Sequence, residues 1–84
     1  MTSVTDARKR QLTQHPESLK RAREWAGLSQ TELAKAIPVS RPLISYLESG
    51  TRSATPAVLK RIAEVLNCPV VMLESKNRYA ETSR

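Results

Sequence analysis

Four residues near the middle of the chain have side chains suited to contacting the edges of DNA bases: Arg41, Pro42, Ser45 and Tyr46. Arginine can donate two hydrogen bonds to guanine, serine can bond several base pairs, and proline can touch a thymine methyl group. In a helix over residues 41–49, at about 100° per residue, most of this row falls opposite Ile44 and Leu47. Such a row is either a base-reading surface or an ordinary solvated face, and its surroundings must distinguish the two.

Two short helices joined by a tight turn are predicted around this row. Ser29 and Glu32 have the spacing of a capping box, and apolar residues follow at helical spacing, so a helix is expected over residues 30–37. Pro38 ends that helix, and Ser40 can cap the next one. Residues 30–49 therefore have the layout of a helix-turn-helix, in which one helix braces the DNA backbone and the next enters the major groove.

The composition favours a polyanionic partner. The 84 residues make one small domain, and 14 basic against 8 acidic side chains leave a net charge of +6. No apolar run approaches a membrane span and no signal peptide is visible, so a cytoplasmic protein without membrane contact is expected. The single cysteine, Cys68, excludes an internal disulfide and a cysteine-based zinc site. No cofactor is expected, and without a nucleophile–base pair or a glycine-rich phosphate loop we expect no enzymatic activity.

Three segments resemble one known family: REWAGLSQTELA at 23–34, VSRPLISYLESG at 39–50 and VLKRIAEVLNCPVVML at 58–73. Over residues 19–73 the chain is similar to the Cro and lambda-repressor type of helix-turn-helix domain, the xenobiotic-response-element family. The positions that match are Gly27, Gln30, Leu33, Ala34, Ile44, Leu47, Glu48 and Gly50. The resemblance implies a compact all-α fold of five helices that binds DNA. Such domains serve in repressors, activators, antitoxins and restriction-modification controllers, so the biological role stays open.

Two prolines depart from the family pattern. Pro38 stands where the turn usually has glycine, and proline cannot adopt a positive φ angle, so the turn must take another shape. Pro42 is tolerated in the first turn of its helix, because its missing N–H would have no partner there. It disfavours helical geometry at Arg41, so the recognition helix, placed over about residues 41–49, is expected to start effectively at Pro42.

Glu48 is predicted to face the core, because it lies on the same side of its helix as Ile44 and Leu47. A carboxylate buried alone is costly and needs a partner. Arg23, at the edge of the buried stripe of the first helix, is the natural counterion, and the resemblance implies the same Arg23–Glu48 pair. The alternative for Arg23 is a contact with a DNA phosphate.

A second set of residues is expected to bind DNA phosphates: Gln30, Ser40, Thr51, Arg52, Ser53 and Thr55. The resemblance implies that Gln30, at the start of its helix, clamps a phosphate, and that the loop after Gly50 touches the backbone. Such contacts give affinity and register without reading sequence. The alternatives are a solvated helix start for Gln30 and a merely solubilising charge for Arg52.

The chain divides into a flexible basic arm (1–14), the DNA-binding domain (15–73) and a polar tail (74–84). The run Arg8, Lys9, Arg10 in the arm either reaches a minor groove or is an ordinary solvated tail. Within the domain, helices are also expected over residues 16–26, from Pro56 to Asn67, and over 69–73. Trp25 is expected to cover the edge of the core.

A homodimer is expected because the C-terminal part of the domain has more apolar residues than a small core can bury: Val65, Val70, Val71, Met72 and Leu73. The alternative is that this segment closes the monomer's own core. The sequence thus predicts a dimeric, sequence-specific transcriptional regulator, a repressor by preference, on a palindromic operator. An antitoxin or accessory factor that binds another protein, such as a toxin, and a non-specific architectural DNA binder are the alternatives.

Overall fold

A computed structural model describes residues 12–75, which contain four α-helices, one 3₁₀ helix and no strand. The helices are α2 (Pro16–Trp25), α3 (Gln30–Ala36), α4 (Arg41–Ser49) and α5 (Pro56–Leu66), and the 3₁₀ helix is η1 (Val70–Leu73). The all-α prediction is confirmed, and within the described residues the short fifth helix expected over 69–73 is a 3₁₀ helix rather than an α-helix. Residues 70–73 make only a single 3₁₀ turn, because Pro69 precedes them and Glu74 returns to extended backbone.

Local capping sets the ends of the helices. The Ser29–Glu32 capping box is formed at α3, and the side chains of Ser40 and Thr55 cap α4 and α5. The helix α4 begins at Arg41, so Pro42 does not delay its start. Gly50 ends α4 and Asn67 ends α5, both with left-handed backbone at φ 81° and φ 58°.

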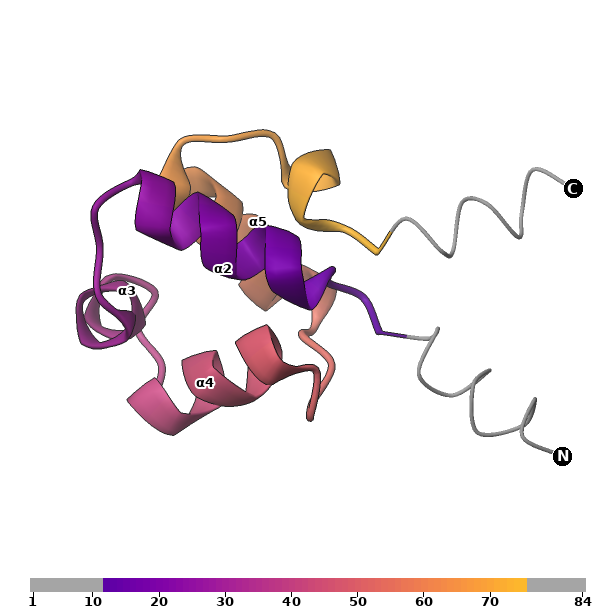
Figure 1. Cartoon of the computed structure of the whole chain (residues 1–84), viewed down its shortest axis with the longest axis horizontal. Coiled ribbons are helices and arrows are strands. Elements are labelled where there is room, and N and C mark those ends of the chain that lie inside the picture. The colour runs from indigo at the N-terminus through magenta and orange to yellow at the C-terminus, as the bar shows by residue number, and fades with distance from the viewer. Residues whose placement is uncertain (1–11, 76–84) are drawn as a thin grey trace, which may run out of the picture.

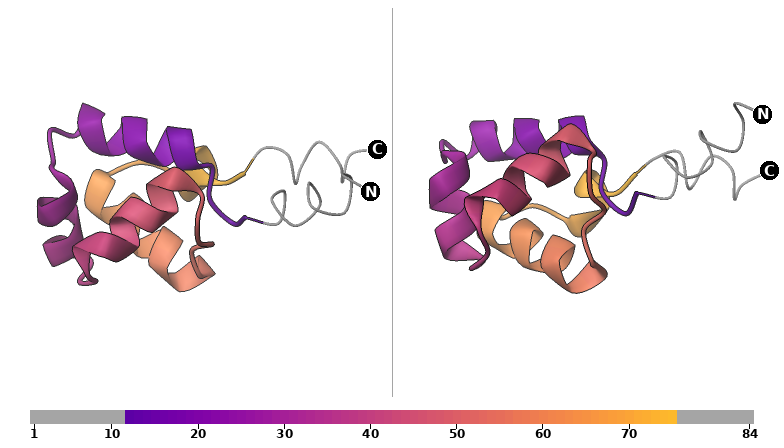
Figure 2. Two further views of the ribbon diagram at one scale, coloured as in Figure 1. Left: turned by 60° about the horizontal axis from the view of Figure 1, so that its bottom comes forward. Right: turned by 90° about the horizontal axis from the view of Figure 1, so that it is seen from below.

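The helices surround one aliphatic core. Viewed as in Figure 1, α2 crosses above α4, α3 joins them at the left, and α5 passes behind α2. Figure 2 shows the same body from below, with α4 in front. The fully enclosed side chains come from every element: Leu19 in α2, Leu33 in α3, Ile44 and Leu47 in α4, Leu59 and Ile62 in α5, and Leu73 in η1. This packing fixes α4 against α2 and α3 and leaves its other side outward.

The two ends of the described chain lie side by side and close the body. The backbone N–H of His15 donates to the carbonyl of Leu73 over 2.7 Å, and that of Ser75 donates to the carbonyl of Thr13 over 3.1 Å. Gln14 and Ser75 are buried. Gln14, assigned to the arm, and Ser75, assigned to the tail, thus pack against the body in this structure. The basic run Arg8–Arg10 lies outside the described residues.

Two apolar side chains differ from their expected places. Leu73 was expected on the dimer surface, but it is fully buried and packs in the monomer's own core. Trp25 was expected to cover the core edge, but 93% of its surface is exposed. The reason is its side of α2: at about 100° per residue Trp25 points away from the side that carries the buried Leu19 and Arg23.

Candidate nucleic-acid interface

The N-terminal half of α4 carries the candidate base-reading residues on the surface. Arg41 and Pro42 are exposed, Ser45 is half-buried, and Tyr46 keeps 43% of its surface exposed. Ile44 and Leu47 face the core and are completely buried. The helix is therefore amphipathic about its axis, with a polar row that a groove of DNA can approach.

The pair Arg23 and Glu48 lies beneath this helix. Arg23 Nε donates to Glu48 Oε2 over 2.6 Å and Arg23 Nη2 donates to Glu48 Oε1 over 3.1 Å, with the side chains 10% and 4% exposed. The hydrogen bond to Glu48 and its charge raise the pKa of Arg23 above the ordinary value, against the opposing effect of burial. Arg23 Nη1 also donates to the carbonyl of Leu28, so the guanidinium holds the end of α2 to α4.

Gln30 extends this pair to the surface. Its Nε2 donates to Glu48 Oε1 over 3.0 Å, and its Oε1 accepts from Arg41 Nη1 over 3.0 Å. A residue expected to bind phosphate therefore contacts a base-reading candidate.

The loop after Gly50 lies beside the exposed side of α4. The guanidinium of Arg52 stands 6.0 Å from the centre of the Tyr46 ring, within the range of a cation–π contact. A hollow of about 260 Å³ lies between the loop and α4, and Arg52, Ser53 and Thr55 all line it. The loop candidates for phosphate contact are thus grouped at one edge of α4.

The serine and threonine residues expected to bind phosphate differ in whether their O–H group is free to donate a hydrogen bond. Ser40 and Thr55 accept hydrogen bonds as helix caps, so each retains its O–H for another acceptor. The O–H of Ser53 donates to Thr13 Oγ1 over 3.2 Å, and Thr51 lies 2.7 Å from the hydroxyl of Ser49. Ser40 and Thr55 are therefore the better placed to donate to a phosphate.

Two supporting residues were not found by sequence reasoning. The buried amide of Gln14 donates to the carbonyls of Leu47 and Arg52 over 3.0 and 2.8 Å and accepts from the N–H of Ala54 over 2.9 Å. Nothing in the sequence pattern marks it. Arg61 Nε donates to the carbonyl of Ile37 over 3.1 Å and holds the turn between α3 and α4. That turn contains a cis Ile37–Pro38 bond and no residue with positive φ, unlike the turn that glycine forms.

Comparison with known families identifies this arrangement. A family profile described as helix-turn-helix matches residues 19–73, most of the chain and nearly all of the folded body. The chain belongs to the Cro/lambda-repressor type of helix-turn-helix family. It is therefore a DNA-binding regulator in general terms, and members of the family are generally not enzymes. No curated protein matches the chain.

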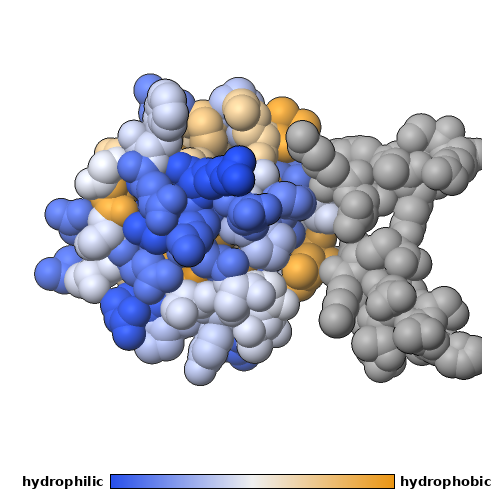
Figure 3. Space-filling model, in the orientation of Figure 1, coloured by the Kyte–Doolittle hydropathy of each residue, from blue (hydrophilic) through white to orange (hydrophobic). Residues whose placement is uncertain are grey.

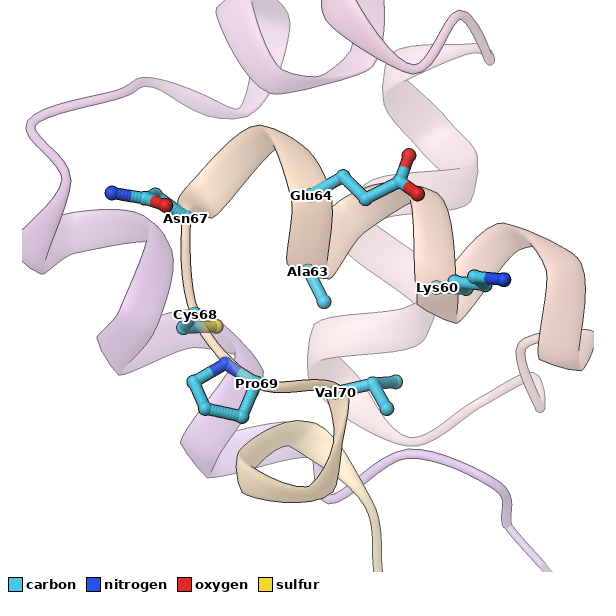
Figure 4. Close-up of a pocket in the computed structure, with 7 residues that line it drawn as sticks. All are labelled: Lys60, Ala63, Glu64, Asn67, Cys68, Pro69 and Val70. Atoms are coloured by element: carbon cyan, nitrogen blue, oxygen red, sulfur yellow. The ribbon is translucent and has the colours of Figure 1, made fainter.

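The helix-turn-helix body also has two hollows away from α4. A groove of about 670 Å³ runs between α2 and the segment 66–73, lined by Trp25, Ala22, Leu66, Val71 and Met72 among others. Figure 3 shows hydrophobic residues along the upper edge of the molecule, over the segment that leads into η1. A second hollow of about 400 Å³ lies between the end of α5 and residues 67–70, with Lys60 and Glu64 on α5 and Cys68 and Pro69 on the loop (Figure 4).

The residues expected at a dimer interface are divided between these hollows. Val71 and Met72 are 56% and 60% exposed at the groove, and half-buried Val70 lines the second hollow. Val65 is half-buried on α5. Partial burial raises the pKa of the Cys68 thiol, which lines both hollows.

The helix-turn-helix domain offers no metal cluster within residues 12–75, where no three His, Cys, Asp or Glu side chains are grouped to hold an ion. Over the same residues, none of the helices has the length and apolar character needed to span a bilayer.

Proposed function

We propose that this protein is a sequence-specific transcriptional regulator, a repressor, that binds a palindromic operator as a homodimer. The observation that carries the proposal is the exposed N-terminal half of α4, which begins with Arg41. Arg41 is hydrogen-bonded to Gln30, and Gln30 is hydrogen-bonded to the buried Glu48. An arginine held at the start of a recognition helix suits a guanine in the major groove.

The base-reading residues of this proposal are Arg41, Pro42, Ser45 and Tyr46. The contacts with phosphates come from Gln30, Ser40, Arg52 and Thr55, and also from Thr51 and Ser53, although the hydroxyls of the last two have internal partners. The backbone contacts supply affinity and register, and the α4 contacts supply specificity.

Dimerisation is the second part of the proposal. A single α4 of 9 residues reaches only a few base pairs, so two copies are needed for the specificity of an operator. The exposed Val71 and Met72, with Val65 and Val70 beside them, support an interface formed by α5 and η1. In such a dimer the half-sites lie about one helical turn apart.

Selection from a random duplex library, followed by footprinting, tests this function. We expect a two-fold symmetric motif with half-sites about 10 base pairs apart, centre to centre. Weak preference without a motif would support an architectural binder instead. A single half-site together with a protein that co-purifies in fixed ratio would support the accessory-factor alternative.

That alternative, an antitoxin-like or accessory protein, is favoured by one specific observation. The exposed Trp25 lines the groove between α2 and the segment 66–73. In Figure 1 that segment and α4 lie on opposite sides of α2. Exposed aromatic residues beside an apolar groove are typical of protein interfaces. A partner seated there leaves the exposed side of α4 open to DNA.

The side chain of Arg41 is predicted to carry base specificity, and that of Arg52 general affinity. On the selected site, Arg41→Ala should cost about 1–3 kcal/mol of binding free energy and flatten discrimination at one base position. Arg52→Ala should weaken all duplexes alike and lower the salt slope by about one ion. Titrations of selected and scrambled duplexes at several salt concentrations measure both effects. Equal weakening of the two duplexes by Arg41→Ala would contradict the assignment.

A further inference from the structure

The groove of about 670 Å³ between α2 and the segment 66–73 has walls of unequal depth. Small side chains at a spacing of four residues form the wall on α2, and larger apolar side chains form the facing wall: Ser18, Ala22 and Ala26 on one side, Leu66, Val71 and Met72 on the other. Because the small side chains extend only a short way from α2, the space between the two walls stays open.

Trp25 lies at the edge of this groove and projects from the body. Its side chain is 93% exposed, and Val71 and Met72 on the facing wall are 56% and 60% exposed. Single exposed apolar side chains are ordinary, but several around one groove form a contiguous patch of the kind that marks an interaction surface. This patch therefore contains both a large projecting side chain and a hollow.

The combination of projection and hollow favours a second copy of the chain as the occupant. Two copies related by a two-fold axis use the same patch, so that patch must be complementary to itself. Here the indole of each copy can enter the groove of the other. The groove lies within the range of roughly 300–1,000 Å³ that accommodates drug-sized molecules, so an indole ring has room in it.

The charges around the groove allow two copies to approach each other. The chain has a net charge of +6, which opposes self-association through a basic surface. Among the residues that line the groove, Arg21 is the one with a charged side chain. Its guanidinium lies 3.8 Å from the carboxylate of Glu17, one turn earlier in α2, so its charge is offset within the same copy.

We propose that this groove receives Trp25 of a second copy, and that two copies exchange their indole rings across a two-fold axis. The inference rests on the proposed function, since it names the surface of the proposed homodimer and places α2, beside η1, at its centre. An interface on this side leaves α4 free for DNA, because α4 and the segment 66–73 lie on opposite sides of α2 (Figure 1).

The area that this exchange buries suits a dimer of moderate stability. An aromatic side chain buries roughly 150–250 Å², and the groove walls that enclose it lose an area of the same order. Each copy therefore contributes roughly 300–500 Å², to which Val71 and Met72 add, against about 800 Å² per partner in a standard interface. We expect the dimer to form at micromolar concentrations, and the two half-sites of an operator to strengthen it.

Trp25 is the single tryptophan of the chain, so its fluorescence reports on this groove alone. In a dilution series of the whole chain, its emission should move to shorter wavelength, and its quenching by acrylamide should weaken, over the concentrations at which sedimentation shows a dimer. Trp25→Ala should raise the dimer dissociation constant at least about tenfold, with the helical spectrum unchanged. The matched control Lys20→Ala, at an exposed position of α2 outside the groove, should leave that constant unchanged.

A mixture of two variants tests the exchange itself. Trp25→Ala keeps the groove and loses the indole, whereas Met72→Asp keeps the indole and puts a charge into the groove wall. In the mixture one indole meets one intact groove, so the heterodimer should form more tightly than either homodimer. The only tryptophan present then belongs to Met72→Asp, and its emission should shift when Trp25→Ala is added.

The outcomes separate this inference from the proposed function. A wild-type dimer whose indole stays as accessible to acrylamide as in the monomer would overturn the inference and leave the proposed function standing. A chain that is monomeric at high micromolar concentration, alone and on the selected duplex, would overturn both the inference and the homodimer. An indole protected only when a different protein is bound would assign the groove to that protein and overturn the second copy. A dimer that buries Trp25 but selects no two-fold motif would refute the proposed function and leave this interface standing.

Discussion

Replacing Glu48 by alanine should lower the free energy of unfolding by about 3 kcal/mol, although no contact between α4 and DNA is removed. The reason is the guanidinium of Arg23, which is only 10% exposed and would lose both hydrogen bonds to the carboxylate. A buried charge left without its counterion is more costly than the pair is favourable. Urea denaturation followed by circular dichroism measures the change.

A double-mutant cycle separates the pair from the individual side chains. Arg23→Ala combined with Glu48→Ala should cost less than the sum of the single variants, because the double change leaves no charge unpaired. The matched control is the pair Arg21 and Glu17 on the same helix, 3.8 Å apart and more than two-thirds exposed. The coupling energy of this exposed pair should be within about 0.5 kcal/mol of zero. Additive costs for Arg23 and Glu48 would mean that the pair does not contribute in solution.

Replacing Gln14 by alanine should cost about 2–4 kcal/mol, comparable with the loss of Glu48. The completely buried amide serves three backbone groups, the carbonyls of Leu47 and Arg52 and the N–H of Ala54. Without it these groups are left without a partner in a region that water enters poorly. The variant Gln14→Glu keeps the size of the side chain but loses both donors, so it should be at least as destabilising as alanine.

Amide hydrogen exchange locates the effect of Gln14 on the loop that approaches DNA. The N–H of Ala54 donates to Gln14 Oε1, so its protection should fall first in Gln14→Ala, whereas the N–H of Leu33 inside α3 should follow global stability alone. Because Arg52 is held through its carbonyl by the same amide, affinity for random duplex should also fall. If the variant is as stable as the wild type and the N–H of Ala54 is still protected from exchange, Gln14 does not stabilise this loop.

Much of the candidate site could be read from the sequence because its position depends on local signals. The capping pair Ser29 and Glu32, the caps Ser40 and Thr55, and the left-handed ends at Gly50 and Asn67 each act over a few residues. Together with apolar residues at helical spacing, they place four helices close to their observed bounds. The side of α4 that carries Pro42 and Tyr46 follows from the same periodicity.

The sequence was less informative where contacts join distant parts of the chain. Gln14 bonds groups 33 to 40 residues away, and no local pattern distinguishes it from a residue of a polar arm. The burial of Leu73 likewise depends on the packing of η1 against α2 and α5, which are distant in the sequence.

The sequence by itself determined the helices, the turn, the amphipathic α4 and the family, because capping and periodicity are properties of neighbouring residues. Only the tertiary structure decided which side chains Gln30 contacts. Its partners Glu48 and Arg41 lie 18 and 11 residues away, and the direction of its amide follows from one acceptor and one donor that the fold brings to either end of it.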